Sequence, residues 1–299
     1  MAEEDNPIKH IPPPWDLKGT SYMFMFWIPS SQARNLPSNI AFSPLEAQST
    51  FANSSKSGSP QGGLGTIQIH RYSSSPAGPY DEFILSTGMY TYAVEENGKR
   101  KEKRNMRISR IYVSQKTACW NGRKGEESIH YLRLPSANET PDWNTPKHLA
   151  RFEFNELPGG ATEIKIFAHD TTGDVREATA DKKPFFQTTY RPVRYMPSFP
   201  LSTSLVRFAG IDLMLAQPPV PEGNSAKGEL VGSDRWCKFY PSISSSQTDA
   251  GWFDMKQDES SKEENFWPGL GRWRLGMSMK NAEISFQNME HWEPPKSTL

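Results

Sequence analysis

Short runs of β-branched and aromatic residues recur along the chain between turn signals, whereas the 3.6-residue period of an amphipathic helix is scarce. In Thr66–His70 and in Arg151–Phe154 every second side chain is apolar. One face of each strand is therefore expected to pack in an apolar core, and the other to face solvent or line a polar space. This pattern predicts a mostly β protein. The predicted strands are Ser21–Ile28, Leu64–Tyr72, Phe83–Val94, Met106–Val113, Arg151–Phe154, Glu163–Ala168, Phe185–Tyr190, Ser204–Leu215 and Arg272–Phe286.

Turn residues divide these strands. Asn97-Gly98 predicts a tight hairpin, because a type I′ turn needs positive φ at both central positions. Ser54–Gly63, Pro218–Gly228 and Ser242–Lys262 are rich in Ser, Gly, Pro and acids, and we expect loops there. Short helices are expected, for instance around Pro44–Ser54. No shift in composition marks a domain boundary, so residues 1–299 are expected to form a single domain.

Charge and cysteine content exclude several classes of protein. The 34 Lys and Arg balance the 34 Asp and Glu, which removes the long-range attraction to nucleic acid or anionic lipid. With Cys119 and Cys237 as the only thiols, neither a disulfide scaffold nor a four-thiolate zinc site can be built. The longest apolar run, Tyr22–Ile28, is far shorter than a bilayer span, and the N-terminus is acidic and polar. We expect a cytoplasmic protein without nucleic-acid or membrane partners.

The common catalytic motifs are absent from the sequence. The six histidines are scattered, and no two of them have a spacing that places both imidazoles on one ion. There is no G-x-S-x-G elbow, no C-x-x-C and no glycine-rich phosphate loop that opens a helix. We therefore expect neither a metal nor a cofactor.

Lys147 is the first candidate for chemistry. It follows Pro146, which fixes the local backbone, and it enters an alternating strand. If its side chain points into a dry interior, burial favours the neutral amine, which can attack a ketone and form a Schiff base. The alternative interpretation, from composition alone, is that Lys147 is a solvated lysine on the surface.

Three segments in order carry a resemblance to a known family. They are Gly78-Pro79-Tyr80-Asp81-Glu82, Asn121-Gly122-Arg123 and Pro146-Lys147. Through them the sequence resembles the acetoacetate decarboxylase family, particularly its larger fungal relatives, over roughly Pro12–Phe154. The resemblance implies a closed, mostly antiparallel β-barrel with few short helices and a buried hydrophobic pocket.

By this resemblance Lys147 is the Schiff-base lysine, and Glu82 is a pocket carboxylate that positions substrate or shuttles protons. The imine would act as an electron sink: carbon dioxide leaves, and a general acid protonates the resulting enamine. The implied protein is a cofactor-independent carbon-carbon lyase in fungal secondary metabolism. It would act on a hydrophobic keto or β-keto acid by decarboxylation or related aldol and dehydration chemistry. The residues expected to bind the substrate are Arg123, His148, Tyr80 and Trp143.

The sequence also departs from the family pattern. His148 stands where the family's decarboxylases have a second lysine, and Thr20 stands where an arginine is associated with the substrate carboxylate. In addition, 22 residues (124 to 145) separate Arg123 from Pro146, where simple decarboxylases have a handful. Residues 124–142 are predicted to form a lid that reshapes the pocket for a ligand bulkier than acetoacetate.

Alternative interpretations accompany these predictions. A barrel that lost imine chemistry would work as a cyclase, isomerase or pericyclase, or as a ligand-binding protein without turnover. Glu82 could cap the Pro79 turn, Arg123 could brace backbone carbonyls, and Tyr80 and Trp143 could be packing residues. The aromatic C-terminal third would either complete the barrel or form a contact in a homo-oligomer; it contains Trp252, Trp267, Trp273 and Trp292.

Overall fold

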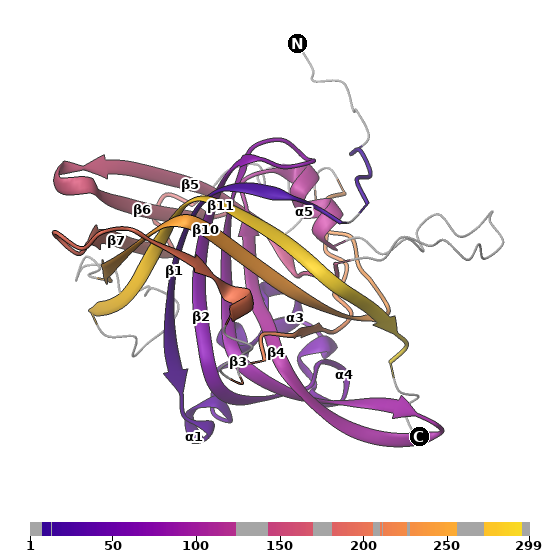
Figure 1. Cartoon of the computed structure of the whole chain (residues 1–299). Helices are drawn as coiled ribbons and strands as arrows, with labels where there is room; N and C mark the ends of the chain where they lie inside the picture. The colour runs from indigo at the N-terminus through magenta and orange to yellow at the C-terminus, as the bar shows by residue number, and fades with distance from the viewer. Residues whose placement is uncertain are drawn as a thin grey trace, which may run out of the picture.

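The computed structural model describes residues 8–12, 14–123, 143–169, 181–205, 210, 212–225, 228–255 and 272–294. The predicted lid, residues 124–142, lies outside these described residues. Within them the protein is mostly β, as predicted, and its strands belong to one sheet (Figure 1). No helix in the described part of the chain is long and apolar enough to cross a membrane.

The sheet is built from long strands, and the helices are short. The strands are β1 Leu17–Ile28, β2 Ser59–Ser74, β3 Tyr80–Glu96, β4 Lys99–Val113, β5 Lys147–Leu157, β6 Ala161–Ala168, β7 Phe186–Pro192, β8 Phe199–Ser202, β9 Leu215–Gln217, β10 Trp236–Asp254 and β11 Trp273–Trp292. The helices are α1 Ser30–Ala33, α2 Ser38–Ala41, α3 Pro44–Ala47, α4 Ser54–Ser57 and α5 Lys116–Arg123, with 3₁₀ turns at Thr50–Ala52 and Pro158–Gly160.

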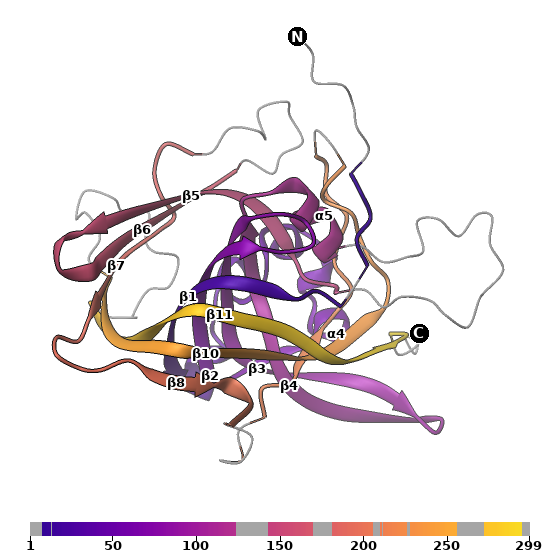
Figure 2. The ribbon, with the colours of Figure 1, turned by 45° about the horizontal axis from the view of Figure 1, so that its top comes forward.

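Nine strands pair in a closed ring. The order is β11, β1, β2, β3, β4, β5, β6, β7 and β10, and β10 pairs back onto β11. Figure 2 shows β10 and β11 running together beside β1, with β5, β6 and β7 gathered at one end. The pairing is antiparallel except that β4 runs parallel to β5 and to β9. Because β9 also pairs with β10, it closes a second, shorter circuit through β11, β1, β2, β3 and β4.

The hairpin prediction is confirmed, and two predictions in the C-terminal half are wrong. Asn97 and Gly98 have φ of 54° and 68° and join β3 to β4. Of the predicted strand Ser204–Leu215, only Leu215 lies in a strand among the described residues. Part of the predicted loop Ser242–Lys262 belongs to β10, because pairing with β11 on one side and with β7 and β8 on the other overrides its serine-rich composition.

The alternation along β1 separates two apolar cores. Phe24 and Phe26 pack on one face of the sheet, in a cluster with Ile67 of β2. Leu17 and Met23 point to the opposite face, into a second cluster that lies within the shorter circuit of strands. This second core contains the candidate site.

Candidate active site

Lys147 and Glu82 form a buried ion pair. Lys147 Nζ lies 2.8 Å from Glu82 Oε2, and the two side chains are only 9% and 3% exposed. β4 holds them together, because it pairs with Lys147 through Ile111 and with Glu82 through Val113. The two residues are 65 positions apart in the sequence (147 − 82), so the parallel pairing of β4 with β5 creates the site.

The chain that leads into Lys147 is fixed to the end of α5. The amide and the hydroxyl of Thr145 both donate to Gly122 O, at 2.9 and 2.7 Å, and Lys147 N donates to Thr145 O at 2.7 Å. Asn144 adopts φ 47°, a conformation that asparagine tolerates better than most residues. These contacts set the direction in which Lys147 enters β5.

Gly122 leaves the space that the lysine side chain fills. A Cβ at this position would lie 2.4 Å from Lys147 Cδ and 2.5 Å from Lys147 Cε. No real Cβ makes contacts this close, so a side chain at residue 122 would displace the lysine. The glycine of the Asn121-Gly122-Arg123 segment therefore serves the packing of Lys147.

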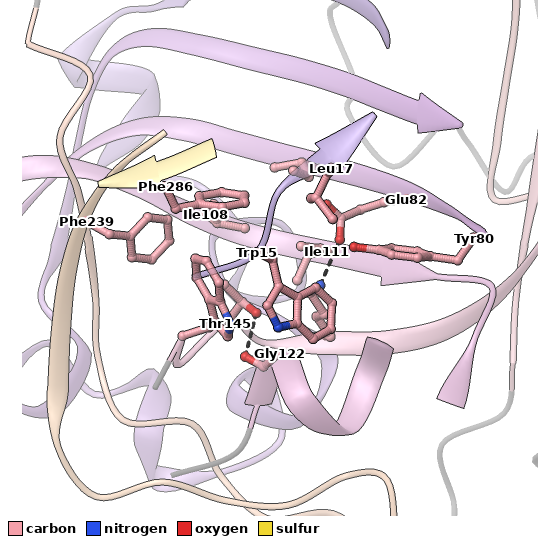
Figure 3. A pocket seen from close by; sticks show the side chains of 13 residues that line it. Trp15, Leu17, Tyr80, Glu82, Ile108, Ile111, Gly122, Thr145, Phe239 and Phe286 are labelled. Atoms are coloured by element: carbon pink, nitrogen blue, oxygen red, sulfur yellow. Dashed lines mark hydrogen bonds and ion pairs between the residues drawn. The ribbon is translucent and has the colours of Figure 1, made fainter. Parts of the chain in front are cut away.

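A small, mainly apolar cavity of about 30 Å³ adjoins the ion pair. The Lys147 ammonium lies 5.6 Å from the centre of the Tyr80 ring and 6.0 Å from that of Trp15. Figure 3 shows Trp15, Tyr80 and Glu82 around one end of this cavity, with Ile108 and Phe286 at the other. The lining residues are Trp15, Leu17, Tyr80, Glu82, Ile84, Ile108, Ile111, Gly122, Trp143, Thr145, Lys147, Phe239 and Phe286.

Glu82 has a second partner, Tyr72. The Tyr72 hydroxyl donates to Glu82 Oε1 at 3.1 Å. Burial and the nearby Glu82 carboxylate raise the pKa of Tyr72 well above its usual range, so this phenol stays protonated at neutral pH and acts as a hydrogen-bond donor. The ring of His70 stacks on Tyr72 at 5.4 Å, and burial lowers the His70 pKa to about 4. The pair is thus flanked by a neutral phenol and a neutral imidazole.

Two predicted substrate-binding residues lie elsewhere. Arg123 is fully buried and donates to Lys147 O and Val231 O, both at 2.9 Å, and to Pro221 O. His148 is fully buried next to Tyr112, at 6.0 Å between ring centres, on the face of β5 opposite Lys147. Neither is among the described residues that line the cavity. Arg123 thus contacts backbone carbonyls, as in the bracing role considered for it, and the substrate-binding role of both residues stays a prediction.

His148 and Cys119, whose thiol lies 3.5 Å from Lys147 O, supply neither charge nor nucleophile to the site at neutral pH. Burial, followed by the charges of Arg123 and Arg110, lowers the pKa of His148 well below its usual range. Burial also raises the pKa of Cys119 to about 12, so its thiol stays protonated. Among these candidates only the Lys147 amine faces the cavity.

Tyr80 and Trp143, predicted either to bind substrate or to pack, both line the cavity, together with several residues that the sequence did not indicate. Trp15 reaches the cavity because its Nε1 donates to Ile11 O at 3.0 Å, while Asn121 binds Ile11 N at 2.7 Å. Phe239 and Phe286 come from β10 and β11, far along the chain. Only Tyr72 carried a detectable signal, because it continues the polar face of the alternating segment Thr66–His70.

The structure is similar to two solved proteins. No protein-family model and no curated protein sequence matches the chain. A structure of acetoacetate decarboxylase superposes with a TM-score of 0.54 at 11% identity, covering 96% of this chain and 93% of that protein. The enduracididine biosynthesis enzyme MppR, in complex with pyruvate, superposes with a TM-score of 0.47 at 13% identity, with the same coverage. The first of these similarities and the strand arrangement together show that this chain has an acetoacetate decarboxylase-like fold.

Proposed function

We propose that the protein is an acetoacetate decarboxylase-like enzyme in which Lys147 forms a Schiff base with a keto compound or β-keto acid. The observation that carries this proposal is the Lys147 Nζ to Glu82 Oε2 distance of 2.8 Å beside an apolar cavity. Buried lysines next to a carboxylate and aromatic walls suit imine chemistry, because the carboxylate can accept the ammonium proton without solvent.

The first stage forms the imine. Glu82 takes a proton from the Lys147 ammonium, and the nitrogen lone pair attacks the substrate carbonyl carbon to give a carbinolamine. The carbinolamine hydroxyl leaves as water after protonation, and a positively charged imine remains on Lys147. Glu82 lies within hydrogen-bond distance of the nitrogen and is placed to pass these protons.

The second stage breaks a carbon-carbon bond in a β-keto acid. The electron pair of the bond to the carboxylate moves to the iminium nitrogen, carbon dioxide leaves, and an enamine forms. Glu82, a carboxylate after the first stage, takes up a proton from water and passes it to the enamine carbon, and a further water molecule hydrolyses the imine to ketone and free lysine. With a substrate that lacks the carboxylate, Glu82 would instead remove an α-proton and open the route to aldol or dehydration chemistry.

A second candidate function follows from the same ion pair. An ammonium that stays bound to its carboxylate is not a nucleophile but is a strong hydrogen-bond donor. Lys147 and Tyr72 would then polarise a carbonyl without a covalent bond, as in a cyclase, an isomerase or a non-catalytic binding site. The two functions differ in whether a bond to Lys147 forms.

Exchange of α-hydrogens of 2-butanone in deuterated water, followed by proton NMR, tests the imine function. Enamine formation exchanges these hydrogens, so we expect enzyme-dependent exchange that is lost in Lys147→Met and in Glu82→Gln. The matched control is Lys18→Met, because Lys18 forms an ion pair of the same 2.8 Å length with Glu283 but both side chains are 63% exposed. Equal exchange by Lys147→Met and the wild type would refute the proposal.

A further inference from the structure

A second cavity of about 260 Å³ shares walls with the Lys147 cavity. Three side chains line both spaces: Ile84 of β3, Ile108 of β4 and Phe286 of β11. Tyr72, which donates to Glu82, also lines the larger cavity. A ligand whose carbonyl reaches Lys147 would therefore meet the larger cavity on the far side of Ile84 and Ile108.

The walls of the larger cavity are mainly apolar, with a polar strip along β2. Met23, Ile243 and Ile284 belong to its apolar part. The polar strip is the face of β2 that carries Thr66, Gln68 and His70, the alternation that the sequence showed. This face lines a cavity inside the shorter circuit of strands, which explains why polar residues alternate along a strand that is buried on both sides.

Ser86 gives the cavity a feature that points to a ligand. It is 2% exposed, it lines the larger cavity, and its hydroxyl has no hydrogen-bond partner among the described residues. A buried hydroxyl without a partner costs free energy that a bound polar group would recover. Ser86 pairs with Thr66 on one side and Ile108 on the other, so it lies next to the polar strip.

We infer that the larger cavity binds an apolar arm of the substrate that carries a hydroxyl or carbonyl group near its far end, opposite Ser86. This inference rests on the proposed function, because it assigns the reacting carbonyl to Lys147. A cavity of about 150 Å³ holds benzene, so 260 Å³ has room for about ten non-hydrogen atoms. Ser86 is four residues beyond Glu82 on β3, roughly 13 Å along the strand, which fits an arm of that length.

The chain-length dependence of borohydride trapping tests the inference. The probes are 2-butanone, 2-nonanone and 9-hydroxy-2-nonanone, and the readout is the adduct fraction by intact mass. We expect half-maximal trapping of 2-nonanone at a concentration at least tenfold below that of 2-butanone, because its additional methylenes leave water. We expect a further gain for 9-hydroxy-2-nonanone.

Two substitutions at Ser86 separate the two parts of the inference. Ser86→Leu fills the cavity and should remove the preference for the long ketones while 2-butanone is still trapped. Ser86→Ala should remove only the gain from the terminal hydroxyl. Ser109→Ala is the matched control. Ser109 is also buried, on β4, but its hydroxyl donates a hydrogen bond to Leu85 O, and it is not among the described residues that line the cavity. If Ser86→Leu does not fold, the comparison of the three ketones and the Ser86→Ala variant still test the inference.

Binding of 2-butanol and 2-nonanol distinguishes failure of the inference from failure of the proposed function, because these alcohols cannot form an imine. Suppose that no ketone is trapped but 2-nonanol binds at least tenfold more tightly than 2-butanol, and that Ser86→Leu removes this difference in affinity. The binding of an apolar arm in the larger cavity is then supported, and the Schiff base is refuted. If all ketones are trapped at the same concentrations and Ser86→Leu does not alter their trapping, the Schiff base is supported and the binding of an apolar arm in the larger cavity is refuted.

Discussion

Two buried ion pairs in the described part of the protein differ in what surrounds them. Arg107 and Glu46 are 1% and 0% exposed, and the guanidinium also donates to Ser57 O at 2.7 Å and lies over the rings of Tyr90 and Phe42. Lys147 and Glu82 are almost as buried but adjoin a cavity, and their further hydrogen-bond partner is the Tyr72 hydroxyl.

The surroundings of the Arg107 pair suit a structural role, and those of the Lys147 pair suit the reactive role that we propose for it. Glu46 also accepts from Ser43 N at 3.1 Å, so the Arg107 pair ties the short helix α3 and the end of α4 to β4. Arginine holds its charge at all accessible pH values and suits such a fixed contact. Lysine gives up its proton more readily, and the cavity that adjoins Lys147 is where the proposed function places the substrate carbonyl. The predictions below test this difference, from the largest change in stability to the smallest.

The largest effect is expected at the structural pair. Arg107→Met leaves the Glu46 charge buried without its partner, which costs about 3–5 kcal/mol of unfolding free energy. Trapping at Lys147 by the folded fraction should persist. Denaturant unfolding provides the measurement, and the control is Lys101→Met at the exposed pair with Glu96, expected to cost less than about 1 kcal/mol. A loss below 1 kcal/mol in Arg107→Met would contradict the structural role.

The next effect is a pH dependence from His70 beside the reactive pair. Burial lowers its pKa from 6.5 to about 4, so the unfolded chain binds more protons than the folded protein between these values. Stability is therefore fully present above pH 6.5 and falls as the pH drops towards 4, by about 3 kcal/mol from this residue. Unfolding of the wild type and His70→Asn between pH 4.5 and 7.5 should show a shallower slope in the variant. Titration of His70 near 6.5 by NMR would contradict this prediction.

A smaller effect is expected at Gly122. Gly122→Ala brings a methyl group into contact with the Lys147 side chain, and overpacking of this kind costs about 1–3 kcal/mol. Displacement of the amine should also slow trapping at least tenfold. In a Lys147→Ala background the added methyl has room, so the stability cost of Gly122→Ala should disappear there. An equal cost in both backgrounds would show that the clash is not with the lysine.

The smallest stability change is expected when both partners of the reactive pair are replaced. Lys147→Met with Glu82→Gln removes the two charges together and keeps the volume, so stability should change by about 1 kcal/mol or less while trapping is abolished. The matched double variant Arg107→Met with Glu46→Gln should remain clearly destabilised, because Ser57 O loses its donor. Equal costs in the two double variants would remove the distinction between the pairs.

The N-terminal strands could be predicted from sequence because their signals are local, and Glu82 and Lys147 of the candidate site each lie in a short motif. Alternation identified β2 and β5, and Asn97-Gly98 identified the hairpin between β3 and β4. The segments with Glu82 and Lys147 were found through ordered short motifs that resemble a known family.

The C-terminal strands, the rest of the cavity wall and the Arg107–Glu46 ion pair depend on contacts between segments that are distant in the sequence. The serine-rich part of β10 looks like a loop in isolation and becomes a strand because neighbours pair on both of its edges. Phe239 and Phe286 reach the Lys147 cavity only because β10 and β11 complete the shorter circuit. Arg107 and Glu46 are 61 positions apart, and neither lies in a motif that predicts an ion pair.

The most direct test of the central claim is the mass of the intact protein after incubation with a panel of β-keto acids and aldehydes plus borohydride, followed by mapping of the modified peptide. We predict one adduct, located at Lys147 and absent from Lys147→Met, with Lys18→Met modified like the wild type. An adduct located on another lysine, or no adduct from ligands that demonstrably bind, would contradict it.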